Sequence, residues 1–507
     1  MRTPSAPAGP LLVLVVSFLV SISGGGAALG QGASTWSEFQ GGPAKTGAAE
    51  QGPEPAYVQV WEQPVEPGGP GARFGLSAPV IAGGVAIAVG PEQVVAVDVA
   101  TGEPSFTVDR DLGPSVPGAV ATVGGTETFV YTQGWGEGPP EVGSSADASS
   151  TTPEPDTPEG EEAQPVDSGV AAFDLETQRP LWPPLPLDAV SRTGVTVDSE
   201  RAFVGMNGGS VAAVDLTGGS LAWQQDLDAQ LITSLAASDG LVIVGLQGDR
   251  DTAPVIVALD ASSGEERWRH EPTDAAAIVS APSVAAGRVH AVFTGLSETT
   301  VVALDLSSGE QRWSRRVNAA FDVVAPPVVA AGSVYVTDPR GQTRALDAAT
   351  GEQRWDFAQN AIVLRTVPVL IGGYLLVPTL DGELGAIAVE SGELVWRGPA
   401  GGSPLRFLAA AGDRLIAVRG AGGSGFVAFE HDPQVALVHE ASPTTLALGR
   451  MLGAMVVVAV PLLVLVLLLG RALRPRMGPA FPHEPGNDED DELPVRDPWE
   501  DEEEPAP

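Results

Sequence analysis

The chain has 507 residues, no cysteine, and 64 acidic against 27 basic side chains, giving a net charge of −37. The lack of cysteine excludes a disulfide scaffold, a zinc–thiolate site and a thiol nucleophile, and the acidity excludes nucleic-acid binding through a broad basic field. The length suits two to four ordinary domains or one large repeat architecture.

Residues 1–30 predict a cleaved secretory signal peptide. Arg2 begins it, an apolar stretch runs from Leu11 to Ile22, and Ala28-Leu29-Gly30 matches a small-x-small cleavage site. Twelve residues are too few to cross a bilayer comfortably, which favours cleavage over the alternative of an uncleaved N-terminal anchor. We therefore expect the chain to be exported.

From residue 96 onward the chain repeats the pattern Ala-x-Asp-x-x-x-Gly-x-x-x-Trp, and such periods indicate a repeat fold. The complete copies are Ala213-Asp215-Gly219-Trp223, Ala258-Asp260-Gly264-Trp268, Ala303-Asp305-Gly309-Trp313 and Ala345-Asp347-Gly351-Trp355. Four altered copies keep the register: Ala96-Asp98-Gly102-Phe106, Ala172-Asp174-Gln178-Trp182, Ala386-Ala388-Gly392-Trp396 and Ala428-Glu430-Gln434-Val438.

One interval in this series is too long. The aspartate-equivalent positions lie 41 to 45 residues apart, except that 76 residues separate Asp98 from Asp174. The segment 136–168 accounts for the excess, with nine acidic residues, no basic ones and many Ser, Thr, Pro and Gly. Such a composition predicts a disordered acidic insertion.

Each unit reads as four short strands separated by turns, as in the runs 279–286, 289–293, 301–305 and 311–315. Helical periodicity is absent from the repeats. The pattern predicts an all-β, eight-bladed β-propeller of four-stranded blades over residues 31–440. A seven-bladed ring is the alternative, because the last copy is degenerate.

The repeated residues have structural roles in this reading. The aspartate ends the third strand and accepts N–H bonds in the turn, the glycine takes a left-handed conformation, and the tryptophan of the outer strand packs between blades. Trp61, in Tyr57-Val58-Gln59-Val60-Trp61, resembles a further outer-strand tryptophan. We expect its strand to complete the last blade and so close the ring.

The repeated motif resembles the tryptophan-docking motif of pyrroloquinoline-quinone (PQQ) repeat propellers, which include quinoprotein dehydrogenases and the outer-membrane assembly factor BamB. The leader Trp36-Ser37-Glu38-Phe39-Gln40-Gly41-Gly42-Pro43-Ala44-Lys45-Thr46-Gly47 is similar to the segment that often precedes such propellers. For a dehydrogenase, the resemblance implies PQQ, calcium and a catalytic aspartate. No motif here places a calcium-binding carboxylate cluster, so we predict no cofactor, and PQQ with calcium is the alternative.

Other residue types do not form a recognisable site. The five histidines, His270, His290, His431, His439 and His483, lack ligand spacing, and Asp249 with Asp251 offers too few ligands for calcium. We expect the outer-strand arginines Arg267, Arg269, Arg312, Arg315 and Arg316 to pair with nearby acids. The glycine run 420–425 lacks the strand–loop–helix setting of a phosphate cradle. No catalytic or metal-binding residue is predicted.

The C-terminal part predicts a single membrane span. After a linker at 441–450, residues 451–470 are apolar and uncharged, long enough for a transmembrane helix. Arg471, Arg474 and Arg476 follow it, so the positive-inside rule places the C-terminus in the cytoplasm. The acidic tail within 471–507 should be disordered.

These features predict a non-enzymatic, membrane-anchored extracytoplasmic scaffold whose partners are envelope or membrane proteins. The alternatives are a PQQ-dependent quinoprotein-like dehydrogenase and a ligand-binding sensor that signals through the acidic tail. The loops between second and third strands share one face with the interblade links. We hypothesise that this face is functional, because it carries the insertion and variable loops often bind.

Overall fold

A computed structural model describes the repeat region of the chain. The described residues are 36–65, 75–134, 168–191, 193–229, 232–248, 252–272, 278–295, 299–317, 325–359, 361–363, 366–399, 403–420 and 424–438. The predicted signal peptide, linker, membrane span and acidic tail lie outside them, as does the acidic insertion apart from Ser168.

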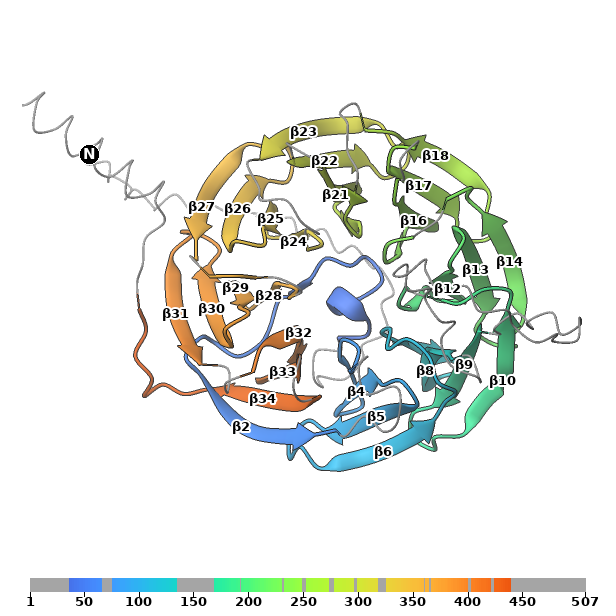
Figure 1. Ribbon diagram of the computed structural model, residues 1–507, viewed down its shortest axis with the longest axis horizontal. Helices are drawn as coiled ribbons and strands as arrows, with labels where there is room; N and C mark the ends of the chain where they lie inside the picture. The colour runs from blue at the N-terminus through green and yellow to red at the C-terminus, as the bar shows by residue number, and fades with distance from the viewer. Residues whose placement is uncertain are drawn as a thin grey trace, which may run out of the picture. The chain divides into compact units, whose positions relative to one another are not determined.

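Eight antiparallel sheets are arranged in a ring (Figure 1). Blade 1 holds β3 (Val80–Ala82), β4 (Val85–Val89), β5 (Gln93–Asp98) and β6 (Pro104–Asp109). Blade 2 holds β7 (Ala119–Val123), β8 (Thr126–Gln133), β9 (Ser168–Asp174) and β10 (Pro180–Leu187). Blade 3 holds β11 (Thr196–Val197), β12 (Arg201–Gly205), β13 (Ser210–Asp215) and β14 (Leu221–Asp226). Blade 4 holds β15 (Ala236–Ser238), β16 (Leu241–Leu246), β17 (Val255–Asp260) and β18 (Glu266–His270).

The second half of the ring follows the same plan. Blade 5 holds β20 (Ser283–Ala285), β21 (Arg288–Thr294), β22 (Thr299–Asp305) and β23 (Gln311–Val317). Blade 6 holds β24 (Val328–Ala330), β25 (Ser333–Thr337), β26 (Gln342–Asp347) and β27 (Gln353–Ala358). Blade 7 holds β28 (Val369–Ile371), β29 (Tyr374–Pro378), β30 (Glu383–Ala388) and β31 (Leu394–Pro399). Blade 8 holds β32 (Leu405–Ala411), β33 (Arg414–Arg419), β34 (Gly425–His431) and β2 (Tyr57–Pro64). The eight-bladed prediction is therefore confirmed, and the seven-bladed alternative is wrong.

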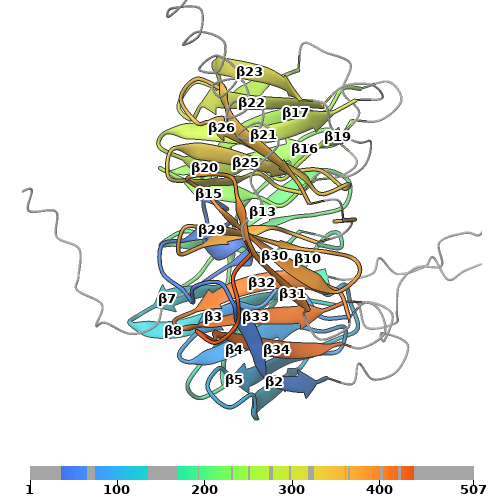
Figure 2. The same cartoon turned by 90° about the vertical axis from the view of Figure 1, so that its left-hand side faces the viewer.

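Blade 8 joins the two ends of the repeat region. Its outer strand β2 pairs antiparallel with β34, beside which it lies in Figure 2. Trp61 is opposite Ala428 in this pair. The buried Arg419 of β33 donates to Glu62 Oε1 at 2.8 Å, tying the closing strand to the blade. Because an early strand completes the last sheet, blade 8 has its full four strands and the ring is closed by the start of the repeat region.

Three short elements add to the blades. The 3-10 turn η1 (Phe39–Gly41) precedes β1 (Ala48–Ala49), which pairs in parallel with β28. β19 (Ile278–Val279) extends blade 5 by pairing with β21. The run at 279–286, expected as one strand, is thus divided between β19 and β20, because Pro282 between them has no N–H for a continuous ladder.

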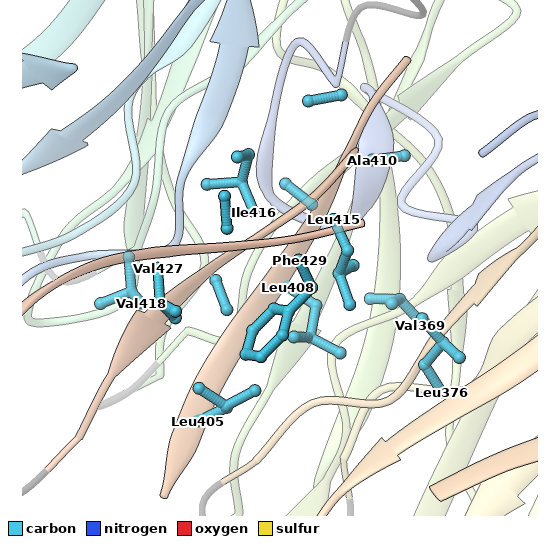
Figure 3. Packing of buried hydrophobic residues seen from close by; sticks show 14 of the residues in the cluster. Val369, Leu376, Leu405, Leu408, Ala410, Leu415, Ile416, Val418, Val427 and Phe429 are labelled. Atoms are coloured by element: carbon cyan, nitrogen blue, oxygen red, sulfur yellow. The ribbon is translucent and has the colours of Figure 1, made fainter. Parts of the chain in front are cut away.

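The core lies between neighbouring blades. Central strands such as β13 (sequence SVAAVD) are buried on both faces, since each blade is covered by two others, whereas the outer β14 alternates exposed and half-buried residues. Figure 3 shows Val369 and Leu376 of blade 7 beside Leu408 and Phe429 of blade 8, all buried. Each interface removes apolar surface that a single blade would expose, so the stability depends on the closed ring.

The strand order gives the ring two different faces. Turns between strands one and two and between strands three and four lie on one side, here called the turn face. Loops between strands two and three lie with the interblade links on the other side, the link face. Gln133 of β8 is paired with Gly169 of β9, so the acidic insertion leaves the link face. Ser168, expected to end the insertion, is instead the first residue of β9.

Candidate functional site

The repeated tryptophans join each blade to the next. At six junctions the indole Nε1 donates to the backbone oxygen of the residue after the aspartate position in the following blade. The pairs are Trp61 with Val99 (3.1 Å), Trp182 with Leu216 (3.1 Å), Trp223 with Ala261 (3.0 Å), Trp268 with Leu306 (2.8 Å), Trp313 with Ala348 (3.0 Å) and Trp355 with Val389 (2.8 Å). The motif therefore acts between blades as well as within them.

The repeated glycines lie directly beneath these indoles. They have φ values between +63° and +76°, and a Cβ added to any of them would lie 2.3 to 2.7 Å from the tryptophan of the preceding blade. The glycines are Gly102, Gly219, Gly264, Gly309, Gly351 and Gly392. Glycine is required for two reasons: the backbone is left-handed, and the indole of the preceding blade lies too close for a Cβ.

Two glycines with the same backbone angle separate these effects. Gly264 and Gly240 both have φ +75°, but only Gly264 lies against an indole, that of Trp223. We expect Gly240→Ala to lower the free energy of unfolding by about 1–2 kcal/mol and Gly264→Ala by a further 1–3 kcal/mol or so from overpacking. Guanidinium unfolding measures both; equal losses would refute the packing role.

The repeated aspartates serve the turns. Each Oδ1 of Asp98, Asp174, Asp215, Asp260, Asp305 and Asp347 accepts backbone N–H bonds from residues two or three positions ahead. At Asp305 the hydroxyl of Ser307 and the guanidinium of Arg312 lower the carboxyl pKa. Arg354 and backbone N–H groups lower the pKa of Asp347 to about 2. These carboxylates are structural.

An arginine seven residues after the aspartate completes three of these turns, a feature that the predicted motif lacks. Arg267 pairs with Asp260 at 2.7 Å, and Arg312 with Asp305 at 2.8 Å. Arg354 pairs with Asp347 at 2.7 Å. Arg269 pairs with Glu266 at 2.8 Å. Pairing with acids, expected for the outer-strand arginines, is confirmed for Arg267, Arg269 and Arg312.

Two junctions depart from the pattern. Between blades 7 and 8, Trp396 packs edge-on against Tyr57, with ring centres 5.2 Å apart. Between blades 1 and 2, Phe106 stands where the tryptophan would be and packs against Phe173 at 5.8 Å. Gln178 stands where the glycine would be, and its Nε2 donates to Leu175 O at 2.7 Å, the carbonyl that an indole would otherwise use. Gln178 thus supplies the donor that phenylalanine lacks.

Two hollows lie at blade junctions in the described part of the ring. One hollow of about 500 Å³ opens on the turn face at the junction of blades 1 and 2, beside Phe106 and Gln178. The other, about 570 Å³, lies between blades 3 and 4 beside the loop after β16. Its charged and amide side chains include Asp226, Asp228, Gln247, Arg269 and Glu271.

The axis of the ring is filled by the chain's own residues 36–49, here called the axial segment (Figure 1, dark blue at the centre). Six of its carbonyls accept the N–H of the second residue of an innermost strand, one blade after another. The acceptor–donor pairs are Trp36–Ile81, Ser37–Val120, Pro43–Ala237, Ala44–Val284, Thr46–Val329 and Gly47–Leu370, at 2.7 to 2.9 Å. These contacts cover blades 1, 2, 4, 5, 6 and 7.

Side chains of the axial segment contact the remaining two blades. Glu38 Oε1 accepts the N–H of Val197 in blade 3 at 3.0 Å, and Phe39 lies edge-on to Phe407 in blade 8, with ring centres 6.1 Å apart. The axial segment therefore bonds or packs against all eight blades.

A buried ion pair lies within this segment. Lys45, the one lysine of the chain, donates to Glu38 Oε2, and the two side chains are 2% and 0% exposed. Burial raises the pKa of Glu38, opposed by the attraction of Lys45. Burying either charge alone would cost several kcal/mol, so both side chains can be buried only because the ammonium and the carboxylate are paired.

The described histidines do not converge on a site. His270, His290 and His431 belong to blades 4, 5 and 8, and His439 and His483 lie outside the described residues. His431 Nδ1 lies 2.7 Å from Pro55 O beside the closing strand. His290 is buried and packs against Trp313 at 6.1 Å between ring centres. The three described histidines are packing or structural residues.

The buried imidazole of His290 should make stability depend on pH. Burial lowers its pKa from 6.5 to about 4, so folding favours the neutral form. Its contribution is full above pH 6.5 and is lost as the pH falls toward 4, by up to about 3 kcal/mol. Between pH 7 and pH 4, the unfolding free energy of the wild type should fall more steeply than that of His290→Phe, which lacks the titrating imidazole. Parallel curves of unfolding free energy against pH would contradict this.

The axial segment and its Glu38–Lys45 pair occupy the axis at the level of the inner strands, and seven inner-strand N–H groups there are bonded to it. Within the described ranges no three His, Asp or Glu residues are grouped to hold a metal ion. Asp249 and Asp251 lie outside those ranges.

The closed ring of tryptophan-docked, four-stranded blades defines a PQQ-type repeat propeller. A family model described as "Outer membrane protein assembly factor BamB" matches residues 166–358, 253–420 and 339–464, and the chain belongs to this family. No curated protein matches the sequence.

Solved propellers share the fold at low sequence identity. BamB from Moraxella catarrhalis aligns with a TM-score of 0.54 and 17% identity, covering 74% of this chain and 100% of its own. A quinohemoprotein alcohol dehydrogenase from Pseudomonas putida gives 0.52 and 12%, covering 80% and 82%. A europium-containing methanol dehydrogenase gives 0.52 and 13%, covering 77% and 90%. Both non-enzymatic and enzymatic propellers are therefore similar in fold.

The membrane span predicted at 451–470 lies outside the described residues. Among the residues that are described, no helix has the length and apolar character to cross a bilayer.

Proposed function

We propose that the chain is an exported propeller, anchored by residues 451–470, that acts as a protein-interaction module for envelope proteins. The observation that carries this proposal is the axial segment, which occupies the centre of the ring and bonds or packs against all eight blades. Because the chain itself fills the position where the blades converge, binding is left to the rims and junctions. Membership of the BamB family supports the same assignment.

Crosslinking of the full-length chain in its native cells tests this function without a guess about the ligand. We expect the same envelope proteins to be crosslinked in repeated experiments, and truncation of residues 477–507 to leave them in place. Absence of any specific partner would contradict the proposal. Loss of a downstream output on truncation, with partners retained, would favour the sensor.

An enzymatic assay addresses the dehydrogenase alternative. The purified chain is mixed with PQQ and calcium and assayed with alcohols and a dye acceptor. We expect no PQQ-dependent dye reduction, because Glu38 and Lys45 close the axis at the inner strands. Reduction that requires PQQ would overturn the proposed function.

Deletion of residues 136–168 tests which face binds. If the link face is functional, the deletion should remove or weaken partner crosslinking, since variable loops on a rigid scaffold carry binding. The deletion joins Trp135 to Gly169 and removes Ser168, the first residue of β9, but leaves Gln133 opposite Gly169, so we expect β8 and β9 to stay paired. Unchanged crosslinking would exclude the insertion as the contact.

A further inference from the structure

The junction between blades 1 and 2 has an open slot and lacks the tryptophan–glycine contact of six other junctions. The hollow of about 500 Å³ is lined by both motif positions that differ, Phe106 from blade 1 and Gln178 from blade 2, together with Leu175 and Glu176. At the six other junctions a tryptophan docks over a glycine. Phenylalanine is smaller than tryptophan, and its ring turns toward Phe173. Gln178 thus takes the place of the indole at this junction, and the slot lies beside it with Phe106 as its aromatic wall.

The slot combines an aromatic wall with a negative rim. Phe106 is half-buried, while Glu127 and Glu176, both exposed, line the same hollow. Gly83 faces Glu127, whose Oε2 would lie 3.4 Å from a Cβ at that glycine, so the carboxylate reaches over the turn. Neither glutamate forms an ion pair within the described residues. Aromatic and cationic groups are both attracted by this arrangement.

The absence of an indole leaves no unsatisfied hydrogen-bonding group at Leu175 of blade 2. Leu175 O already accepts from Gln178 Nε2, so no backbone acceptor is left unsatisfied when the indole is absent. An incoming group must therefore find its polar partners at the rim. The two carboxylates provide them for a nearby ammonium or guanidinium.

We propose that this slot binds an aromatic side chain of a partner protein, preferentially tryptophan, flanked by lysine or arginine. The partner's ring would lie against Phe106, outside the space that Gln178 fills, and its cations would face Glu127 and Glu176. The proposal deepens the proposed function by naming the chemistry of the partner. It places this contact on the turn face, opposite the insertion.

A model peptide tests the slot directly. Acetyl-Lys-Trp-Lys-amide carrying 5-fluorotryptophan is titrated with the full-length chain in detergent buffer and followed by ¹⁹F NMR. Phe106→Trp/Gln178→Gly fills the slot with the pair found at the other junctions, and its unfolding midpoint shows that it folds. We expect at least about tenfold weaker peptide binding by this variant.

Charge is tested separately. Glu127→Gln/Glu176→Gln should weaken binding about fivefold at low salt while leaving the fold intact, since both residues are exposed. Acetyl-Lys-Ala-Lys-amide should bind far more weakly than the tryptophan peptide. If the filled slot binds as well as the wild type, if the alanine peptide binds equally, or if nothing binds, the proposal is overturned.

The slot and the proposed function can fail independently. Peptide titration requires no natural partner, so its failure leaves the crosslinking result standing. Absence of crosslinked partners would overturn the interaction function even where the peptide binds.

Discussion

Replacement of Lys45 with methionine is expected to lower the free energy of unfolding by about 3–5 kcal/mol. The substitution keeps most of the side-chain volume but leaves the carboxylate of Glu38 buried without its counter-charge. Glu38 also holds blade 3 through Val197 N–H, so the disturbance reaches the ring. Chemical unfolding followed by tryptophan fluorescence measures the loss.

A double variant isolates the charge. Lys45→Met/Glu38→Gln removes both charges and keeps an oxygen for Val197, so it should recover much of the stability lost by Lys45→Met. The pKa of Glu38, already raised by burial, rises further without Lys45. Its stabilising neutral form is then present at low pH and lost as the pH rises, so Lys45→Met should be relatively more stable at pH 5 than at pH 8. A double variant as unstable as the single one would refute the charge argument.

Replacement of Trp61 with alanine is expected to cost about 3 kcal/mol and to loosen the ring at its closure. The side chain fills the junction above Gly102 and donates to Val99 O at 3.1 Å, and it belongs to the strand that joins the two ends of the repeat region. Its loss removes packing from blades 1 and 8 together. Thermal unfolding and hydrogen–deuterium exchange of β2 measure the two effects.

Trp223 provides the matched control. It is likewise half-buried and donates to Ala261 O at 3.0 Å, but it lies on β14 within a continuous blade. Trp223→Ala should cost a similar free energy while leaving exchange in β2 slow. If both variants leave β2 equally protected, Trp61 does not serve the closure.

The sequence predicts most of the fold because the repeat carries its own register. Aspartates that recur every 41 to 45 residues mark the ends of the third strands. Trp61, in the run that begins at Tyr57, indicates an outer strand that precedes the first repeat and therefore has to join another blade. Both depend on local patterns of apolar residues and turns, which are visible in a single chain. These patterns do not locate single residues, so they miss that β9 begins at Ser168 and that the run around Pro282 is divided into β19 and β20.

Contacts across blades are much less visible in the sequence. The glycine of one unit receives the tryptophan of the preceding one, as Gly264 receives Trp223, yet both residues read as parts of their own motifs. Gln178 appears as a degenerate glycine, although it replaces the indole's hydrogen bond. A substitution to Phe at 106 together with Gln at 178 is the signal that could have revealed this compensation.

The sequence also does not predict that the leader lies on the axis of the ring. Residues 36–47 match the segment that precedes similar propellers, but that resemblance assigns no place to Glu38 or Lys45. The contacts join residues far apart in the chain, such as Gly47 with Leu370. The one unusual feature of the leader in the sequence is that it contains the chain's single lysine. Lysine is ordinarily a surface residue, so this feature predicts an exposed Lys45, whereas the side chain is buried.

Hydrogen–deuterium exchange of the full-length chain tests most directly whether the chain fills its own axis. Peptides covering residues 36–49 and the innermost strands are followed by mass spectrometry. We predict that the inner-strand amides that donate to this segment, such as those of Ile81 and Leu370, exchange as slowly as the central strands of the blades, and that the Gly41 and Gly47 amides, bonded within 36–49, are protected with them. Exchange of these inner-strand amides within seconds, with the central strands still protected, would show that the axis is open and would contradict the account.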